Sequence, residues 1–436
     1  MTRRTTRLLV GAFALALAAT GCGRDSGGGS GGSTGGDGAM KTDFGVTTEP
    51  CKDSPNLTKG CIYLGTLSDL TSGPFKALAV PITEAQKKFW ERVNSNGGLD
   101  GWGVDVTTYV RDNKYNPEIQ KQVYQEIKPK ILGLAQTLGS PTTAAIIADL
   151  KSSKIVSSPA SWTSAWAFED VIIETAANYC AESMNSVDYA VEELKVKSVM
   201  AVHYAGDYGD DGAAGAKIAA EKNGLSFEDV ETPSGQDNQA GAIQAIVSKK
   251  PDLIILTTAP TDAAVIIGQA AAKGYTGKFI GTAPSWNPGL LKSPAAAAIK
   301  ALYLQSSPVE PFGADTPGHK AMRDTLGSGV TPNDGYTAGW GFSYAMKAVL
   351  SKAIANNDLS RAGVLAAVKQ IDKVDFEGML PEGAGNYAAN ANDGVTRATV
   401  ITKVDETAPT GTTVIKKFFT GPTAKDYKFE KPCFQN

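Results

Sequence analysis

IYLGTLSDLTSGP, residues 62–74, is a short apolar run that ends in a Ser-Gly-Pro turn. The segment that follows, residues 82–98, places apolar side chains at helical spacing and ends at two glycines, which stop a helix. Residues 104–110 then alternate in side-chain character, as a strand does. This order of strand, helix and strand predicts a mostly parallel sheet that helices cover on both faces.

The same alternation of strand and helix signals continues along most of the chain. A first series runs to about residue 175, and a second begins with a helix at residues 176–194 and continues to residue 307. The C-terminal part adds three helical segments and two strands, at residues 322–326, 339–353, 361–371, 397–404 and 412–419. Two α/β units, with C-terminal elements able to return to the first unit, predict a two-lobed body with a cleft.

The N-terminus has the order of an export signal. Three arginines precede an apolar run from Leu8 to Ala19, which is shorter than the ~20 residues of a transmembrane helix. The sequence Ala19-Thr20-Gly21-Cys22 then resembles a bacterial lipobox, although Ala19 stands where leucine is more usual. We expect a signal peptide at residues 1–21 and a lipid on Cys22. An ordinary secretory signal with a chance cysteine is the alternative.

The segment after Cys22 predicts a flexible linker. Residues 23–38 contain no aliphatic or aromatic side chain, so they cannot bury enough surface to offset the entropy of ordering. Roughly 20 residues of such a chain have a typical reach of about 25 Å. We assign residues 22–50 to the lipidated cysteine and this linker, and we expect an extracytoplasmic body that its lipid holds at the cell membrane.

The composition is that of an ordinary globular protein, with 42% hydrophobic and 20% charged residues among 436. Loss of the three arginines of the signal peptide changes the formal net charge from −3 to −6, and no basic run remains. Nucleic-acid binding is therefore not expected, since it needs concentrated lysine and arginine. No second apolar segment approaches spanning length, so the lipid is the only membrane attachment that we expect.

Besides Cys22, the chain contains Cys51, Cys61, Cys180 and Cys433. An even number of cysteines in an exported protein indicates two disulfides, for which three pairings are possible. We expect Cys51–Cys61 to close a short loop before the first strand and Cys180–Cys433 to tie the C-terminal tail to a central helix. A metal site is the competing interpretation, but the chain has no Cys-x-x-Cys and only two histidines, so we expect none.

The order and spacing of several segments resemble type I periplasmic solute-binding proteins, the leucine/isoleucine/valine-binding family that feeds ABC importers. The resemblance spans residues 61–349 and becomes looser beyond them. The matching segments are IYLGTLSDLTSGP (62–74), RVNSNGGLDGWGVDVTTYVRDNKYNP (92–117), LGSPTTAAI (138–146), SSPASWTSAW (157–166), DYGDDGAAGA (207–216), KKPDLIIL (249–256) and GQAAAKGYTGKFIG (268–281).

This resemblance implies a fold and a mode of action. The first lobe would contain residues 61–175 and 308–385, the second lobe residues 176–307 and 386–430, and three crossings of the chain would form the hinge. A small molecule would bridge the lobes and favour the closed state, which a membrane permease recognises. The protein would then act as a monomer, without cofactor, metal or catalytic residues.

The loop between the strand and the helix near residue 140 is the first implied ligand site. Ligands of parallel α/β sheets bind beyond the carboxyl ends of strands, where loops meet helix N-termini. Gly139, Ser140 and Thr142 offer backbone N–H groups and hydroxyls there to a carboxylate. Simple N-capping by Ser140 or Thr142 is the alternative, and the same atoms can serve both roles.

Other implied ligand contacts follow the neighbouring strands. The resemblance places Ala160 and Ser161 at the ligand, with Trp162 where the family has a hydroxyl residue. Tyr208 matches the aromatic lid of the second lobe, or is a surface tyrosine in a turn. The remaining implied rim positions are Thr258, Ala259, Ala283 and Trp286. Trp162, Trp166, Trp286 and Trp340 either line a slot for a flat apolar ligand or pack the loops.

The class of ligand stays open between two possibilities. Ala283 falls where the amino-acid-binding relatives place an acid for the ligand's ammonium group. Either another acid takes over, with Asp207 and Asp262 the nearest candidates, or the ligand has no ammonium. Family resemblance favours a branched-chain or other amino acid; the alternative is an aromatic or apolar carboxylate.

Two other functions are alternatives to that of a receptor for an importer. A ligand-sensing receptor of the same fold, reporting to a signalling partner, leaves the same signature in the sequence. An exported hydrolase is the rival from another class, but the chain beyond the Gly/Ser-rich linker has no Gly-x-Ser-x-Gly, and it has only two histidines. The glycine-rich segment at residues 206–217 matches neither nucleotide-binding pattern, so nucleotides are not expected.

Overall fold

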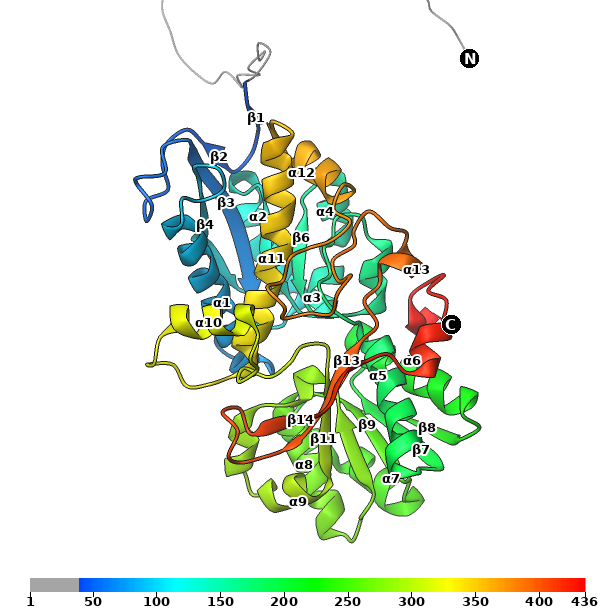
Figure 1. Ribbon diagram of the computed structural model, residues 1–436. Helices are drawn as coiled ribbons and strands as arrows, with labels where there is room; N and C mark the ends of the chain where they lie inside the picture. Colours follow the sequence, from blue (N-terminus) through cyan, green and yellow to red (C-terminus); the bar gives the residue numbers. More distant parts are fainter. Residues whose placement is uncertain (1–38, 436) are drawn as a thin grey trace, which may run out of the picture. The chain divides into compact units, whose positions relative to one another are not determined.

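The computed structural model describes residues 39–435, and the predicted signal peptide and lipidated Cys22 lie outside them. Within these residues, no helix has the length and apolar character needed to cross a membrane. Figure 1 shows two α/β lobes, one built mainly from the blue and cyan part of the chain and one mainly from the green part.

The first lobe is built around β3 (Gly60–Ser68). β3 pairs in parallel with β4 (Trp102–Asp112) and β5 (Gly133–Leu138), and β5 pairs with β6 (Ser157–Ala160). The short β2 (Val46–Thr47) adds an antiparallel pair to β3. The helices of this lobe are α1 (Lys76–Ser95), α2 (Pro117–Ile127), α3 (Ser140–Ala144), α4 (Ile147–Ser153), α10 (Pro317–Leu326), α11 (Asp334–Ala355) and α12 (Arg361–Val368).

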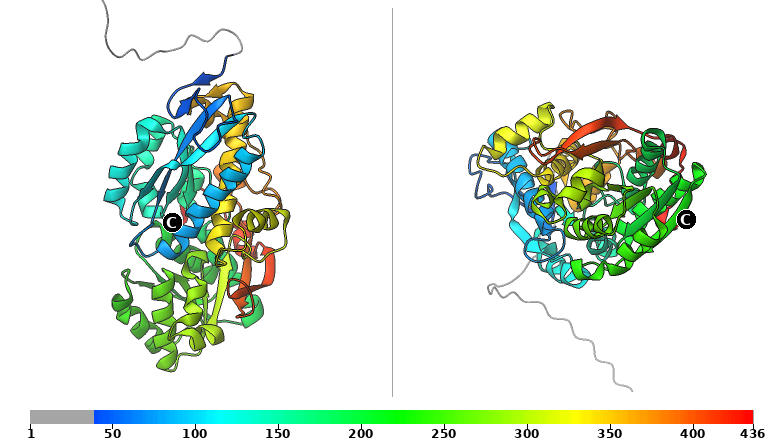
Figure 2. Two further views of the ribbon diagram at one scale, coloured as in Figure 1. Left: turned by 90° about the vertical axis from the view of Figure 1, so that its left-hand side faces the viewer. Right: turned by 90° about the horizontal axis from the view of Figure 1, so that it is seen from below.

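The second lobe contains a seven-stranded sheet of order β14-β13-β11-β10-β9-β7-β8. Its parallel strands are β7 (Ser198–His203), β8 (Ser226–Glu231), β9 (Leu253–Thr257), β10 (Lys278–Gly281) and β11 (Tyr303–Ser307). β13 (Thr399–Val404) and β14 (Thr412–Phe419) join antiparallel at one edge, where the red hairpin is seen in the left view of Figure 2. Its helices are α5 (Tyr179–Tyr189), α6 (Asp207–Lys222), α7 (Ala240–Lys249), α8 (Pro260–Ala272), α9 (Ala296–Leu302) and α14 (Pro422–Asp426).

Each sheet is buried on both faces, which explains the apolar strands. Along β7, Val199 and Ala201 belong to the core under α5 and α6, whereas Met200 and Val202 belong to the core under α7 and α8. Successive side chains of a strand point to opposite faces, so a strand covered on both sides is apolar throughout. The predicted α/β architecture, with mostly parallel sheets flanked by helices, is confirmed.

The chain passes between the lobes in three segments. They connect β6 to α5, β11 to α10, and α12 to β13; the last of them includes α13 (Ala391–Gly394). The C-terminal strands return to the second lobe, because β13 pairs with β11. The residue boundaries predicted for the lobes stay a prediction.

The flexible linker predicted for residues 22–50 reaches too far along the chain. β1 (Lys41–Thr42) pairs with β12 (Asp358–Leu359), and β2 pairs with β3. A Cβ atom on Gly45 would lie 2.1 Å from the backbone nitrogen of Leu132, so the chain packs against the lobe there. Backbone hydrogen bonds hold residues 41–47 against the first lobe, although the composition of this segment does not indicate a strand.

Both predicted disulfides are confirmed. Cys51–Cys61 closes a loop with a sequence separation of 10, and Cys180–Cys433 closes one of 253, which ties the C-terminus to α5. Asp211 lies beside the second disulfide, and these three residues are the one cluster of potential metal ligands found in the described chain. The sulfur atoms of Cys180 and Cys433 are bonded to each other, so neither is a thiolate that could hold a metal.

Candidate ligand-binding site

A pocket lies between the lobes, at the carboxyl ends of strands of both sheets, in a space of about 720 Å³ that includes open solvent. The first lobe supplies Phe75, Leu78, Ile82, Tyr115, Leu138, Gly139, Ser140, Ala160, Ser161, Trp162, Asp334, Gly335, Ala338 and Phe342. The second lobe and the crossings supply Tyr179, Tyr208, Ala283, Pro284, Trp286, Gln305, Ser307 and Val309.

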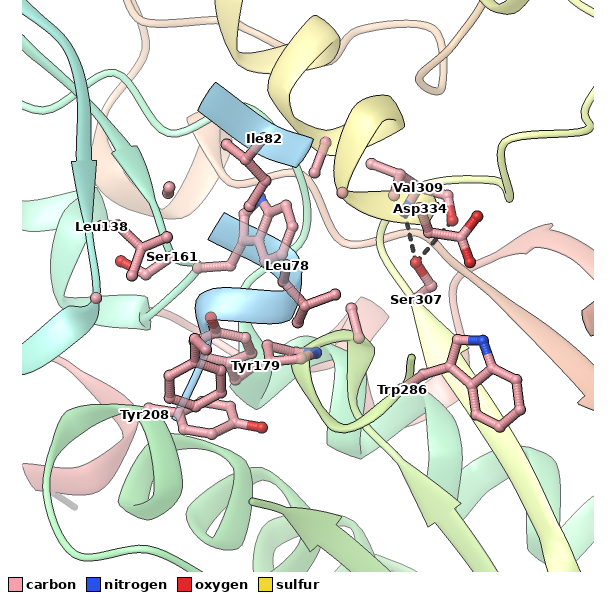
Figure 3. Close-up of a pocket in the computed structure, with 18 of the residues that line it drawn as sticks. Leu78, Ile82, Leu138, Ser161, Tyr179, Tyr208, Trp286, Ser307, Val309 and Asp334 are labelled. Carbon is pink, nitrogen blue, oxygen red and sulfur yellow. Dashed lines mark hydrogen bonds between the residues drawn. The ribbon is translucent and has the colours of Figure 1, made fainter. Parts of the chain in front are cut away.

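Most of the pocket wall is apolar or aromatic. Leu78 and Ile82 enter from α1, and Ala338 and Phe342 enter from α11, so the pocket reaches between these helices into the first lobe. Figure 3 shows Leu78 and Ile82 between Ser161 on one side and the pair Ser307 and Asp334 on the other. A ligand in this space therefore has an apolar middle section in contact with α1.

One side of the pocket carries three hydrogen-bond donors that the protein does not use elsewhere. Ser140 Oγ and Trp162 Nε1 are buried and have no hydrogen-bond partner among the described residues. Ser161 Oγ accepts a hydrogen bond of 3.1 Å from Trp166 Nε1, which leaves its own proton to donate. A buried donor without a partner is costly, so this side is suited to an acceptor such as a carboxylate.

Three of the predicted contact residues do not line the pocket. Thr142 Oγ1 donates to the carbonyl oxygen of Gly139 at 2.9 Å, and the carbonyl of Thr258 accepts from the Tyr208 hydroxyl at 3.2 Å. Ala259 precedes α8. Ligand contacts of these three residues stay a prediction. The predicted residues that line the pocket are Gly139, Ser140, Ala160, Ser161, Trp162, Tyr208, Ala283 and Trp286.

Tyr208 contributes its ring, not its hydroxyl, to the pocket. The hydroxyl donates to Thr258 and lies 3.1 Å from Thr282 Oγ1, inside the second lobe. The ring makes edge contacts with Tyr179 and with Phe75 of the first lobe, at centroid distances of 4.7 and 5.9 Å. The contact between Tyr208 and Phe75 joins the two lobes and closes one side of the pocket.

Asp262, one of the two predicted candidates, does not take the place of the acid that is absent at Ala283. Asp262 accepts hydrogen bonds from the Tyr204 hydroxyl and from the Gly235 N–H at 2.5 and 2.7 Å, and it does not line the pocket. The side chain of Asp207 lies outside the described part of the chain. Glu182 accepts the Ala283 N–H at 2.9 Å, and burial raises its pKa well above the usual value. Glu182 therefore supports the loop behind the pocket.

The tryptophans divide between the pocket and the packing of loops. Trp286 lines the pocket, but its Nε1 donates to the Thr410 carbonyl at 3.0 Å and its ring stacks on Tyr303, so the indole points under the C-terminal hairpin. Trp166 donates a hydrogen bond to Ser161, and the ring of Trp340 packs on the ring of Phe89. Trp162 lies 5.3 Å from Phe342, centroid to centroid, within the pocket wall.

Asp334 is the charged residue of the pocket lining, and the sequence analysis did not single it out. It begins α11, and one of its carboxylate oxygens accepts the Phe312 N–H at 2.8 Å. Burial raises its pKa to about 6, while the Phe312 N–H and, after it, the Thr410 hydroxyl act to lower it. Among the described lining residues there is no lysine, arginine or histidine.

Comparison with known families accounts for this architecture. A family model described as periplasmic binding protein matches residues 62–409. The chain belongs to this family.

Solved structures give the same answer. A fatty acid ABC transporter substrate-binding protein from Thermomonospora curvata is 28% identical, with a TM-score of 0.80 over 89% of this chain and 97% of that one. A branched-chain amino acid ABC transporter from Thermus thermophilus, with bound valine, is 17% identical, with a TM-score of 0.71 over 84% of this chain and 98% of that one. A comparison with curated proteins finds no match. The chain is thus a substrate-binding protein of an ABC transporter, a class of solute-binding proteins and not of enzymes.

The lobes of this binding protein are in contact across the pocket. Pro81 lies inside α1 and has no N–H, so it leaves the carbonyl of Ala77 without its helical partner. Asn287 of the second lobe donates to this carbonyl from Nδ2 at 3.4 Å, and Asn333 donates to it at 3.3 Å. Together with the ring contact of Phe75 and Tyr208, this hydrogen bond links α1 to the second lobe.

The raised pKa of Asp334 predicts how the stability of the binding protein depends on pH. A carboxyl whose pKa is higher in the folded than in the unfolded state stabilises the fold fully below its unfolded value and loses this contribution as pH rises through about 6. At about pH 7.5, Asp334→Asn should raise the free energy of unfolding by about 2–3 kcal/mol, and at about pH 4 the gain should vanish. Urea unfolding of both proteins across this range measures the difference, and a gain that does not depend on pH would contradict the assignment.

Proposed function

We propose that this protein is the lipid-anchored, extracytoplasmic receptor of an ABC importer and that its ligand is a carboxylate with an apolar body. The observation that carries the proposal is the polarity of the pocket. Ser140, Ser161 and Trp162 offer donors on one side, and the remaining wall is largely apolar. Neutral donors in a dry pocket hold a carboxylate well, because hydrogen bonds to charged groups are stronger than neutral ones.

Two observations favour a plain carboxylate over an α-amino acid. The acid that an ammonium group needs is absent at Ala283, and Asp262 is occupied by its own hydrogen bonds away from the pocket. A buried ammonium without a counter-charge is costly. The similar structure from Thermomonospora curvata, described as a fatty acid substrate-binding protein, supports the same class of ligand, whereas the structure with bound valine is only 17% identical.

Binding would act through closure of the lobes. A ligand that touches Ser140 on the first lobe and Tyr208 on the second gains contacts in the closed state that the open state cannot give, so it shifts the population toward closure. The closed form would then deliver the ligand to a membrane permease, and no bond of the ligand is made or broken.

The serine donors give the direct test. Isothermal titration calorimetry should show that decanoate or phenylacetate binds and that the deaminated analogue of leucine binds more tightly than leucine. The double variant Ser140→Ala with Ser161→Ala should weaken binding of the acid about 100-fold, since each hydrogen bond to a charged group contributes about 1.5 kcal/mol or more. Ser157→Ala is the matched control, because Ser157 Oγ is also buried and without a partner but lies outside the pocket lining.

Two results would count against this assignment. Leucine binding at least as tightly as its deaminated analogue would move the ligand to the amino acids. An undiminished affinity in the double variant would remove Ser140 and Ser161 from the carboxylate site, whatever the ligand.

The anchor has its own prediction. Cys22→Ala should release the protein from the membrane into the soluble fraction, with ligand affinity unchanged, because the lipid is the proposed attachment and the linker keeps it apart from the pocket. Fractionation of cells followed by calorimetry on the released protein measures both. Retention of the variant in the membrane would contradict a lipid on Cys22.

A further inference from the structure

The side of the pocket opposite the donors carries acceptors. Asp334 and Ser307 lie across from Ser161 in Figure 3, with Leu78 and Ile82 between them. The Ser307 hydroxyl is engaged with the backbone of Val309. The available groups on this side are therefore the carboxylate of Asp334 and, beside Ala283, the side chain of Gln305.

Both residues line the pocket, and each has a side-chain oxygen atom that can accept a hydrogen bond. Gln305 uses its Nε2 to donate to the carbonyl of Ala283 at 3.3 Å, which leaves Oε1 as its remaining polar atom. Asp334 receives one hydrogen bond from the described residues, the N–H of Phe312 on one of its two oxygens. One side of the pocket is thus a set of donors, and the other is a set of acceptors.

No positive side chain of the described residues compensates Asp334. Its pKa responds to burial, to the Phe312 N–H and to the Thr410 hydroxyl, and to no lysine or arginine. Glu310 lies on the crossing segment between β11 and α10; burial raises its pKa and Lys417 opposes that rise, and Glu310 is not among the groups that shift the pKa of Asp334. An ionised carboxylate that is buried without a counter-charge is costly, so a group that fills this side of the pocket must either donate to it or force its protonation.

We propose that the natural ligand carries a hydrogen-bond donor, an ammonium or a hydroxyl group, at the end remote from its carboxylate, and that Asp334 accepts from it. The ligand class is then an ω-amino or ω-hydroxy acid with an apolar middle section. This inference rests on the proposed function, because it takes the donor side as the place of the carboxylate. Asp334 selects among such acids by the group at the far end.

Matched pairs of acids test the proposal. The probes are the straight-chain acids from butyrate to dodecanoate, each with its ω-amino and ω-hydroxy analogue, titrated calorimetrically into the purified protein. At the chain length that spans the pocket, the analogue should bind about 10- to 100-fold more tightly than the plain acid at about pH 7.5. In Asp334→Asn the ratio of the affinity for the ω-amino acid to that for the plain acid should fall to about 1. Asp324→Asn, an exposed control on α10, should keep the ratio of the unaltered protein.

A pH series on the unaltered protein gives a second readout. A methyl group beside Asp334 binds only when that carboxyl is protonated, so the affinity for the plain acid should rise as pH falls through about 6. The ω-amino acid is held by the ionised form, so its affinity should fall over the same range. These opposite slopes would not arise from a merely structural role of Asp334 at the start of α11.

The possible outcomes distinguish failure of this inference from failure of the proposed function on which it rests. Plain acids that bind as tightly as their analogues at every length, with parallel pH profiles, would overturn the role of Asp334 and leave the carboxylate receptor standing. Failure of every acid to bind would overturn the proposed function itself. Analogues that keep their advantage in Asp334→Asn would place the donor elsewhere in the pocket and refute the assignment.

Discussion

Replacing both Cys180 and Cys433 by alanine is expected to lower the free energy of unfolding by about 5 kcal/mol. The bond between them closes a loop with a sequence separation of 253, and cross-linking a long loop removes much entropy from the unfolded chain. Without the bond the C-terminal tail is held to α5 and α6 by packing, by the hydrogen bonds of Thr423 to Asp188 and by the ion pair of Lys222 with Asp426. Denaturant unfolding under non-reducing conditions measures the loss.

The short disulfide supplies the control for this prediction. Replacing Cys51 and Cys61 by alanine opens a loop with a separation of only 10, for which the same relation gives about 3 kcal/mol. The variant without Cys180–Cys433 should therefore lose about 2 kcal/mol more stability than the variant without Cys51–Cys61, because its loop is longer. Equal losses would show that strain and local packing, not loop entropy, determine the contribution of the long bond.

Gly339→Ala should destabilise the first lobe by about 3 kcal/mol although alanine is the better helix former. A Cβ atom on Gly339 would lie 2.2 Å from the carbonyl oxygen of Ile82 and 2.8 Å from its Cα, and backbone atoms cannot turn aside as a side chain can. α1 and α11 would have to separate. Thermal or urea unfolding measures the cost.

Gly341→Ala, two residues further along the same helix, is the matched control. A Cβ atom there meets no atom within 4 Å, so the change should be neutral or stabilise the helix by up to about 1 kcal/mol. Because Leu78, Ile82 and Phe342 line the pocket from these two helices, Gly339→Ala should also weaken ligand binding. Equal stability of the two variants would show that α11 tolerates displacement from α1.

Much of the fold follows from local sequence patterns. The runs at residues 62–67 and 253–257 are largely apolar because each lies in a sheet covered on both faces, and this pattern needs no knowledge of distant residues. The helix that ends at residues 97–98 and the loop at Gly139 follow equally from local signals. The number of disulfides follows from the count of cysteines, whereas their pairing is one of the three that the sequence allows.

The candidate site was predictable only where it follows the ends of strands. Ser140 and Ser161 come directly after strands, and Tyr208 lies in the first turn of the helix that follows a strand. The carboxyl ends of parallel strands meet at one edge of a sheet. Leu78, Phe342 and Asp334 belong to helices or helix ends, and their sequence surroundings are those of ordinary packed or capping residues. Only the approach of α11 to α1 turns them toward the pocket.

The sequence by itself therefore determined the α/β architecture and the strand ends that carry the donors, because these depend on periodicity and on residues close together in the chain; the export signal stays a prediction. The tertiary structure alone decided which side chains face one another across the cleft. It turned Thr142 and Asp262 to partners within their own lobes, and it placed Asp334 opposite Ser161. The placement of Asp334 depends on the approach of segments more than a hundred residues apart, and no local sequence pattern records such an approach.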